Sequence, residues 1–240
     1  MTDALYTTDA YLREFSATVT AVNAEIKTVT LDRTAFYPGG GGQQHDMGEL
    51  IGVDGVVYPV VKAKKEGGDI VHIVDGSVLP SVGEHVTGKL DWERRYQAMR
   101  THTAMHILCG VIWRDYQVSV TGGNMDFLAA RMDFEFAELS REMIAEINEK
   151  INAEVRNSRP TQVKILPREE AFQIPDLIRT KINLLPEGIR EVRVVEIIGL
   201  DLQADGGTHV ANTSEIGHIE ITDYKSKGAA NKRLYVEIKD

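Results

Sequence analysis

The sequence predicts an α+β fold, in which a small N-terminal β-barrel is followed by an α/β-sandwich-like body. Segments of alternating apolar and polar residues follow one another from residue 15 to about residue 91. A proline-free stretch, residues 92–115, then has the composition of a helix. Strand and helix patterns are mixed in the remainder. We therefore expect two domains, residues 1–91 and residues 92–240.

Composition excludes several classes of protein. The chain has 240 residues, with 42% hydrophobic and 26% charged residues, as in an ordinary soluble globular protein. A net charge of −9 argues against a general nucleic-acid binder, so we expect no DNA partner. A single cysteine excludes a disulfide framework and fits a reducing compartment. Without a signal-peptide pattern or a membrane-spanning apolar run, we expect a cytoplasmic protein and no membrane partner.

The barrel is predicted from short strands of similar length. Residues 15–22 alternate, residues 23–25 resemble a hairpin turn, and the alternation resumes at residues 26–31. Turns that contain Gly, Asp or Pro separate the further candidates, which are residues 48–53, 55–63, 69–74 and 85–91. Strands at this spacing favour a small barrel.

One insertion, residues 34–48, interrupts the strands and contains four consecutive glycines, at 39–42. Ordering such a segment costs backbone entropy. It is either a flexible linker or a loop whose backbone approaches a ligand. Phe36, Tyr37 and Pro38 are unusual in a solvated linker, so we favour the ligand loop. The segment lacks the lysine and the following helix of a phosphate-binding P-loop.

Two histidines lie four residues apart in the predicted helix 92–115. At this spacing His102 and His106 share one face, with Cβ atoms roughly 5–6 Å apart. They form either a metal-binding pair or a chance or hydrogen-bonded pair. Apolar residues fall largely on another face and would anchor the helix; these are Ala98, Met105, Leu108 and Ile112.

A second pair of potential ligands, Asp205 and His209, encloses Gly-Gly-Thr. Because glycine disfavours helix and permits positive φ, we expect a tight turn here. A Zn²⁺-type ion accepts imidazole nitrogen and carboxylate oxygen. His102 and His106 with Asp205 and His209 would therefore complete a four-ligand site.

The other elements follow from periodicity and capping. Residues 124–136 read as a strand or hairpin, and a helix is expected from its N-cap Ser140 to about Arg156. Helical or looped pieces are expected at residues 169–183, and strands at residues 161–166, 191–198, 216–224 and 233–238.

Four ordered motifs, at residues 36–43, 102–106, 206–209 and 212–217, together resemble the AlaX family. Its members are free-standing relatives of the alanyl-tRNA synthetase editing domain. The resemblance covers about residues 14 to 240, and the glycine-rich loop is typical of the longer AlaX class. It implies an editing (deacylase) domain that hydrolyses the ester joining serine, and as a further candidate glycine, to tRNA(Ala).

The resemblance also implies one zinc ion per chain, with His102, His106 and His209 as ligands. In the synthetase motif the fourth ligand is cysteine, whereas this chain has Asp205. Asp205 either binds the metal, which would weaken selectivity for zinc over Mn²⁺ or Fe²⁺, or stands behind a histidine and orients it. Cys109 lies seven residues from His102, about 10 Å along a helix, and is expected to be a core thiol.

No general base stands out in the sequence. Gln43 and Thr103 are the polar residues that we place around the substrate as catalytic candidates, although Thr103 could be an ordinary helix residue. Basic residues that contact tRNA, or are simply solvated, fall into two groups. They are Arg94, Arg95 and Arg100 in the helix, and Lys225, Lys227, Lys232 and Arg233 near the C-terminus.

Two other functions remain open from the sequence. One is a non-catalytic tRNA- or synthetase-binding module whose metal is structural, which four protein ligands and no bound water would favour. The other is a small-molecule metallohydrolase or a 2-His-1-carboxylate oxygenase, which turnover independent of tRNA would favour.

Overall fold

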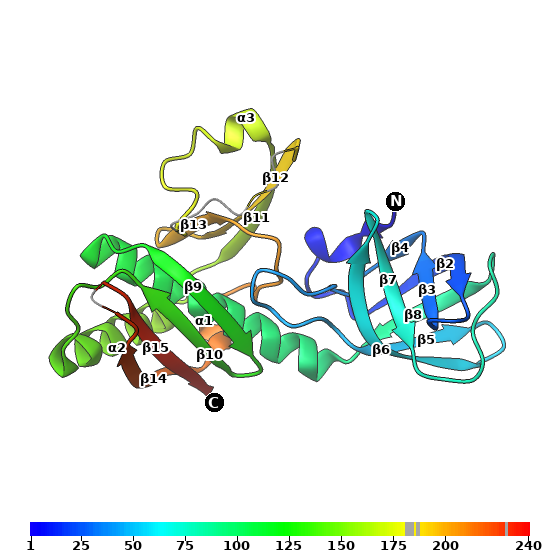
Figure 1. Ribbon diagram of the computed structural model, residues 1–240, viewed down its shortest axis with the longest axis horizontal. Helices are drawn as coiled ribbons and strands as arrows, with labels where there is room; N and C mark the ends of the chain where they lie inside the picture. The colour runs from blue at the N-terminus through cyan, green and yellow to red at the C-terminus, as the bar shows by residue number, and fades with distance from the viewer. Residues whose placement is uncertain (181–184, 186–187, 229) are drawn as a thin grey trace. The chain divides into compact units, whose positions relative to one another are not determined.

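The computed structural model describes residues 1–180, 185, 188–228 and 230–240 (Figure 1). The chain divides into two compact units, Met1–Tyr96 and Gln97–Asp240, which are described separately below. Compactness alone does not show that either part folds independently, so the domains 1–91 and 92–240 stay a prediction. The predicted α+β class, with an N-terminal barrel, is confirmed.

The first unit is built around a closed barrel in which the strand order is β2-β3-β7-β6-β5-β8. The six strands predicted from alternation are all present: β2 (Glu14–Asn23), β3 (Thr28–Leu31), β5 (Gly48–Gly52), β6 (Val57–Glu66), β7 (Asp69–Val74) and β8 (His85–Leu90). Along β8 exposed and buried residues alternate strictly, as expected for a wall with one face on the core. Gly88 faces inward, where a Cβ would lie 2.3 Å from Phe15 Cζ.

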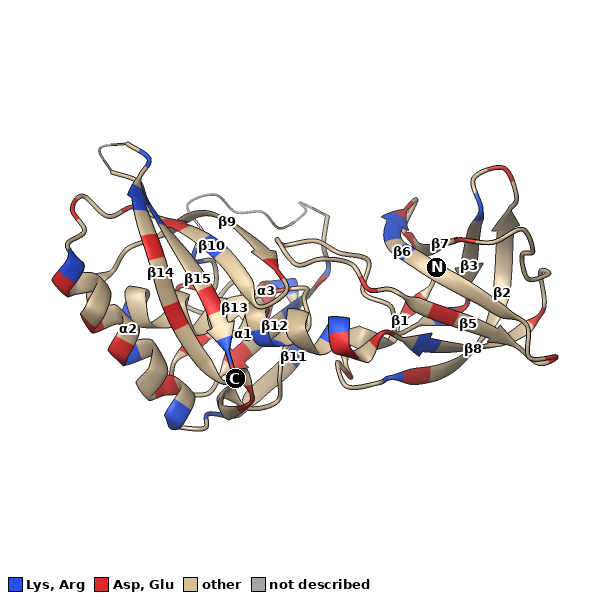
Figure 2. Cartoon of the chain, turned by 90° about the horizontal axis from the view of Figure 1, so that it is seen from below, with Lys and Arg blue, Asp and Glu red and all other residues tan. Residues whose placement is uncertain are grey.

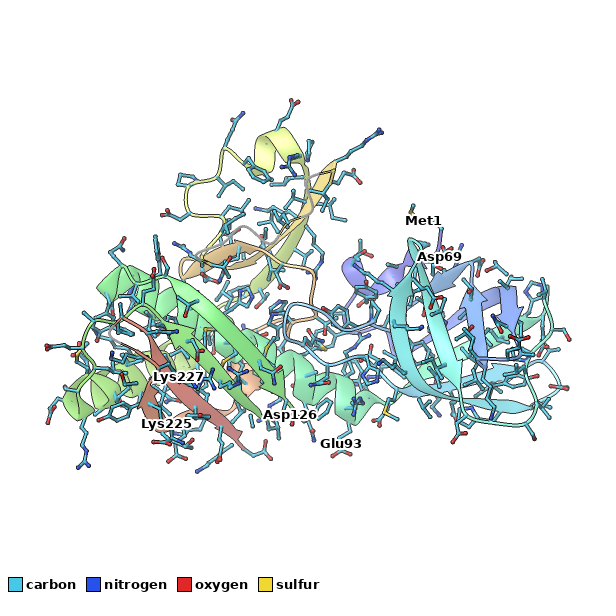
Figure 3. All side chains as sticks on the ribbon, in the orientation of Figure 1. Met1, Asp69, Glu93, Asp126, Lys225 and Lys227 are labelled. Carbon is cyan, nitrogen blue, oxygen red and sulfur yellow. The ribbon has the colours of Figure 1, made fainter. Side chains whose placement is uncertain are left out.

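Three short elements of the first unit were not predicted. Strand β1 (Asp3–Ala4) pairs in parallel with β4 (Arg33–Thr34), and a 3₁₀ turn, η1 (Leu5–Thr7), follows β1. The N-terminal ammonium of Met1 lies 3.3 Å from Asp69 Oδ1, and Figure 3 shows the two residues together at the end of β7. Two-residue strands carry too little alternation to be recognised in a sequence.

The second unit contains most of the long helix α1 (Trp92–Tyr116), which confirms the predicted helix. Every residue from 101 to 112 is buried. This part of α1 is therefore a core helix that is covered on all sides. The apolar residues expected to anchor the helix are all buried: Ala98, Met105, Leu108 and Ile112. Helix α2 (Arg141–Arg156) begins as predicted, with Ser140 Oγ accepting a hydrogen bond from the Met143 amide at 3.2 Å.

Two antiparallel sheets complete the second unit. The first has the order β14-β15-β10-β9, formed by β9 (Val120–Asp126), β10 (Ala129–Phe134), β14 (His218–Ser226) and β15 (Lys232–Lys239). Asn152 of α2 joins the helix to this sheet, because its side chain bonds both the amide and the carbonyl of Ile219. The second sheet has the order β11-β12-β13, formed by β11 (Thr161–Pro167), β12 (Glu191–Ile197) and β13 (Asp201–Ala204).

The remaining differences from expectation are local. Strand β13 was not predicted, and η2 (Thr213–Ile216) is a 3₁₀ turn at the expected start of a strand. A short helix, α3 (Arg168–Ala171), lies within the expected pieces at 169–183, of which residues 181–183 lie outside the described residues. Among the described helices, none combines the length and the apolar character needed to cross a bilayer.

Candidate metal centre

Helix α1 supplies the first pair of potential ligands. His102 and His106 lie one turn apart, with ring centroids separated by 5.1 Å, and both side chains are buried. A helix fixes this spacing because residues four apart stand one above the other. The sequence-based placement of both imidazoles on one face is therefore correct.

The loop after β13 supplies the second pair. Asp205 Oδ2 accepts the Gly207 amide at 2.7 Å, which forms a tight turn that carries His209 back toward α1. The turn itself was predicted. The expectation of positive φ is wrong, because neither Gly206 nor Gly207 is among the described residues with positive φ. At Gly206 a Cβ would meet open space.

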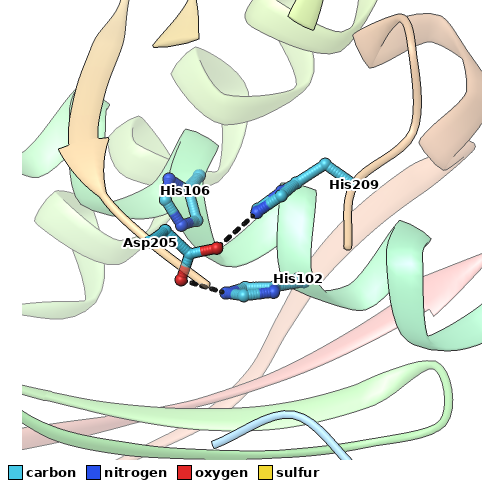
Figure 4. Close-up of side chains that lie close together, drawn as sticks. All are labelled: His102, His106, Asp205 and His209. Atoms are coloured by element: carbon cyan, nitrogen blue, oxygen red, sulfur yellow. Dashed lines mark hydrogen bonds and ion pairs between the residues drawn. The ribbon is translucent and has the colours of Figure 1, made fainter. Parts of the chain in front are cut away.

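The two pairs converge on one small volume (Figure 4). The four potential ligand atoms of His102, His106, Asp205 and His209 all lie within 4.8 Å of one another. Asp205 stands between two imidazoles: its Oδ2 lies 3.0 Å from His209 Nε2 and its Oδ1 lies 3.4 Å from His102 Nε2. The His209 ring centroid is 4.3 Å from that of His102 and 4.7 Å from that of His106.

The far nitrogen of His209 is held by Thr103. Thr103 Oγ1 lies 3.2 Å from His209 Nδ1, accepts the Val210 amide at 3.1 Å and donates to the Met99 carbonyl at 2.9 Å. A hydroxyl has one hydrogen and two lone pairs, so these three contacts saturate it when Nδ1 carries the imidazole hydrogen. The Nε2 lone pair of His209 then faces Asp205.

The far nitrogen of His106 is held by a carboxylate. His106 Nδ1 lies 2.9 Å from Oδ2 of Asp201, whose side chain is fully buried. An ionised carboxylate only accepts hydrogen bonds, so Nδ1 must carry the hydrogen and the Nε2 lone pair is left free. Neither Asp201 nor its partner Gln203 was recognised from the sequence, because nothing in the pattern there separates an orienting carboxylate from an ordinary strand residue.

Burial and neighbouring charges shift the pKa values of three of these groups. Burial would raise the pKa of Asp205, but His102 and His209 hold it well below the usual value. Burial and the neighbouring His102 keep the pKa of His209 well below 6.5. Burial lowers the pKa of His106, but the hydrogen bond to Asp201 and the negative charges of Asp201 and Asp205 together outweigh it and leave this pKa raised. Asp205 is thus anionic and His209 neutral at pH 7, the forms that bind metals.

The donor set fits a divalent cation. Nε2 of His209 and Oδ2 of Asp205 face each other at 3.0 Å. Either a hydrogen on Nε2 or a cation bound by both atoms must lie between them, because two lone pairs at this distance repel. Three imidazoles with one carboxylate are ligands suited to Zn²⁺ and also to Mn²⁺ or Fe²⁺. These four residues could therefore hold one metal ion.

Cys109 takes no part in this donor set. Its thiol is buried, and burial raises its pKa well above 9.0. Gln203 Nε2 donates to Sγ at 3.4 Å. A thiol that stays protonated is a poor ligand, since metals bind the thiolate. The prediction of a core thiol is confirmed.

The glycine-rich loop belongs to the first unit and is an ordered turn. Gly39 to Gly42 all have positive φ, and the amides and carbonyls of Gly40 and Gln43 bond reciprocally at 3.1 and 2.9 Å. At the base of the loop, the Tyr37 amide donates to Asp46 Oδ2 at 2.6 Å, and the Asp46 amide donates to the Tyr37 carbonyl at 2.9 Å. The linker alternative is therefore wrong. Gln43 is buried within this loop.

An arginine clamp holds the base of the loop. Arg95 is fully buried, pairs with Asp46 through Nε and Nη2, and donates to the Ala10 and Ala35 carbonyls. Arg94 Nε donates to the His45 carbonyl at 3.1 Å. In the second unit, Arg100 is buried and donates twice to the Ile216 carbonyl.

These contacts correct part of the predicted tRNA surface. Phosphate contact by Arg95 and Arg100 is wrong, because both guanidinium groups are buried among protein acceptors. Sequence alone cannot separate a buried arginine from a solvated one, since the long side chain can follow either course.

The second basic group lies at the hairpin of β14 and β15, where Figure 2 shows Lys and Arg positions. Lys225 and Lys227 are exposed, and Figure 3 labels both there. Lys225 Nζ is 3.4 Å from Asp223 and stands over the Tyr235 ring at 5.0 Å. Lys232 Nζ donates to the Gly228 carbonyl at 2.9 Å. Arg233 forms a bidentate ion pair with Asp133, in which Nε donates to Oδ1 at 2.7 Å and Nη2 donates to Oδ2 at 2.8 Å.

Comparisons with known proteins agree with this architecture. An "Alanyl-tRNA editing protein AlaX-M" of Saccharolobus solfataricus is 41% identical over 242 residues, which span the whole of both chains. The chain belongs to the AlaX family. Another protein of that name, from Methanosarcina barkeri, is 38% identical over the whole of both chains.

Relatives of the AlaX family include larger enzymes. An "Alanine--tRNA ligase" of Pyrobaculum aerophilum is 39% identical over 224 residues, which make up 90% of this chain and 25% of the ligase. Residues 192–235 match the family model of the threonyl and alanyl tRNA synthetase second additional domain. Residues 6–94 match the model of class II (A) tRNA synthetases. The first match contains Asp205 and His209, and the second contains the barrel and the glycine-rich loop.

Proposed function

We propose that the chain is a trans-editing deacylase that hydrolyses the ester between serine and tRNA(Ala), with glycine as a second candidate amino acid. Full-length similarity to alanyl-tRNA editing proteins supports the editing role. The observation that carries the chemistry is the convergence of three imidazoles and Asp205 within 4.8 Å. Such a site suits ester hydrolysis more directly than any other group of the described residues.

His102, His106, Asp205 and His209 would hold one zinc ion, with Mn²⁺ or Fe²⁺ as alternatives. A bound metal of this kind lowers the pKa of water or polarises the ester carbonyl. Thr103 serves this site as a positioning residue, because its saturated hydroxyl holds His209 and has no hydrogen bond left for a substrate. This replaces the expected direct contact of Thr103 with the substrate.

Discrimination between serine and alanine needs a polar contact. The two amino acids differ by one hydroxyl, and a pocket that bonds this hydroxyl leaves its own groups unpaired when alanine enters. The test is release of labelled amino acid from Ser-tRNA(Ala), Gly-tRNA(Ala) and Ala-tRNA(Ala). Faster release of serine supports the proposal, and equal rates for serine and alanine would contradict it.

Gln43 is the residue that we propose for a hydrogen bond with the substrate. Replacing it by alanine is expected to slow serine release about tenfold, the effect of one such bond, and to leave the zinc content unchanged. Gln44→Ala, in the neighbouring position, is the matched control. Wild-type rates for Gln43→Ala would remove Gln43 from the substrate site.

Lys225 and Lys227, at the hairpin of β14 and β15, are proposed to contact tRNA phosphates together with Lys232 and Arg233. Lys225 and Lys227 are the most exposed of the four, so Lys225→Gln/Lys227→Gln is expected to weaken tRNA binding and lower the slope of log Kd against log salt by about 2. A control with the same loss of charge is Lys150→Gln/Lys164→Gln. An unchanged salt slope in the hairpin variant would contradict the assignment.

The four-residue donor set also favours one other function. Four protein ligands can close a tetrahedral coordination sphere, as in structural zinc sites. The chain would then be a tRNA- or synthetase-binding module. In that case tRNA binding would persist while both Ser-tRNA(Ala) and Ala-tRNA(Ala) stay intact.

A further inference from the structure

A buried carboxylate stands directly behind one of the proposed ligands. Asp201 is the first residue of β13, and none of its side chain is exposed. Its Oδ2 lies 2.9 Å from His106 Nδ1. Carboxylates in this position behind a histidine fix its tautomer and raise its basicity toward a metal.

Two polar side chains hold Asp201 in place. Gln203 Nε2 donates to the same Oδ2 at 2.7 Å, and Arg179 Nε lies 3.7 Å from Oδ1. The nearby guanidinium offsets the negative charge of a carboxylate that has no access to water. The two short contacts of Asp201, to His106 and to Gln203, are both made by Oδ2. They hold the carboxylate toward the imidazole.

The close approach of Asp201 to α1 depends on a glycine. Gly110 is the one glycine of α1, and it lies one turn after His106 on the same face. A Cβ at this position would lie 2.9 Å from Asp201 Cβ and 3.0 Å from Leu200 Cγ. Glycine is less favourable than alanine in a helix interior. The space that it leaves is filled by the start of β13, which brings Asp201 to His106.

We propose that Asp201 is a positioning residue that sets the tautomer of His106, and that Gly110 is the residue that allows it to do so. Asp201 keeps the hydrogen on Nδ1 and directs the Nε2 lone pair into the space shared with His102, Asp205 and His209. In this role Asp201 tightens metal binding without touching the metal or the substrate. The effect on metal binding rests on the metal site of the proposed function, whereas the effect on the tautomer concerns the chain alone.

Two measurements test this proposal. In metal-free wild-type protein, ¹⁵N NMR of the histidine side chains is expected to show His106 with its hydrogen on Nδ1. In competition with a chromophoric chelator, Asp201→Asn is expected to bind Zn²⁺ roughly 10- to 100-fold more weakly than wild type. Gly110→Ala, which pushes Asp201 away from α1, is expected to weaken Zn²⁺ binding in the same direction. Asp115→Asn makes the same chemical change on a carboxylate at the far end of α1 and should retain wild-type affinity.

The outcomes separate this inference from the proposed function. A His106 ring with a hydrogen on Nε2 and none on Nδ1 in the wild type overturns it without the need for any variant. A Zn²⁺ affinity of Asp201→Asn within about threefold of that of Asp115→Asn overturns it as well. Wild-type protein that binds Zn²⁺ as expected but releases no serine would sink the editing proposal and leave the role of Asp201 intact. If Asp201→Asn does not fold, the NMR result and Gly110→Ala decide the question.

Discussion

Replacing Asp205 by alanine is expected to lower the zinc affinity of the protein by more than about 100-fold and to reduce serine release in proportion. The reason is the position of this carboxylate, which lies within 3.4 Å of two imidazoles and cannot be replaced by another described carboxylate of the donor set. Zinc content and chelator competition measure the first effect, and release of labelled serine measures the second.

The variant Asp205→Cys tests whether residue 205 binds the metal directly or only orients a histidine. A thiolate is a softer ligand than a carboxylate, so this variant is expected to keep zinc and to shift the preference further from Mn²⁺ toward Zn²⁺. Asp205→Asn, which keeps the shape and removes the charge, is the control for local packing. Full zinc affinity in Asp205→Ala would place Asp205 outside the coordination sphere and leave three histidine ligands.

Breaking the clamp beneath the glycine-rich loop is expected to have the largest effect on stability. Arg95→Met leaves Asp46, which is 1% exposed, as an uncompensated buried charge. Loss of one partner of such a pair costs about 3–5 kcal/mol, measured as the free energy of unfolding in denaturant. The double variant Arg95→Met/Asp46→Leu removes both charges and is expected to be more stable than Arg95→Met alone.

A surface pair of the same barrel provides the comparison. Lys64 and Glu66 form an exposed ion pair, so Lys64→Met is expected to change the free energy of unfolding by less than about 1 kcal/mol. If Arg95→Met lowered the free energy of unfolding as little as Lys64→Met, the ion pair of Arg95 and Asp46 would not be what holds the base of the loop together.

The parts of the fold that depend on local periodicity were predictable. Six barrel strands follow from alternation, and α1 and α2 follow from composition and from the cap at Ser140. Strand β13 has four residues and adjoins the Asp205 turn, so its pattern is too short to detect. The burial of residues 101–112 of α1 on all sides was missed because buried polar residues look the same in sequence as solvated ones.

The four potential metal ligands could be predicted from the sequence, whereas the residues that support them could not. His102 and His106 are local, and Asp205 and His209 are local, so each pair is visible as a spacing. The contact from Asp201 to His106 spans 95 residues, and that from Asp46 to Arg95 spans 49. Such pairs are set by the tertiary fold, and single-sequence patterns carry no signal for them.

The most direct test of the central claim is serine release from Ser-tRNA(Ala) by the protein as purified, after removal of metal by a chelator, and after zinc is added back. Release that stops on chelation and returns with zinc, while Ala-tRNA(Ala) stays intact throughout, is the predicted result. Serine release that continues at the same rate in protein shown to be free of metal would contradict a metal-dependent site at His102, His106, Asp205 and His209.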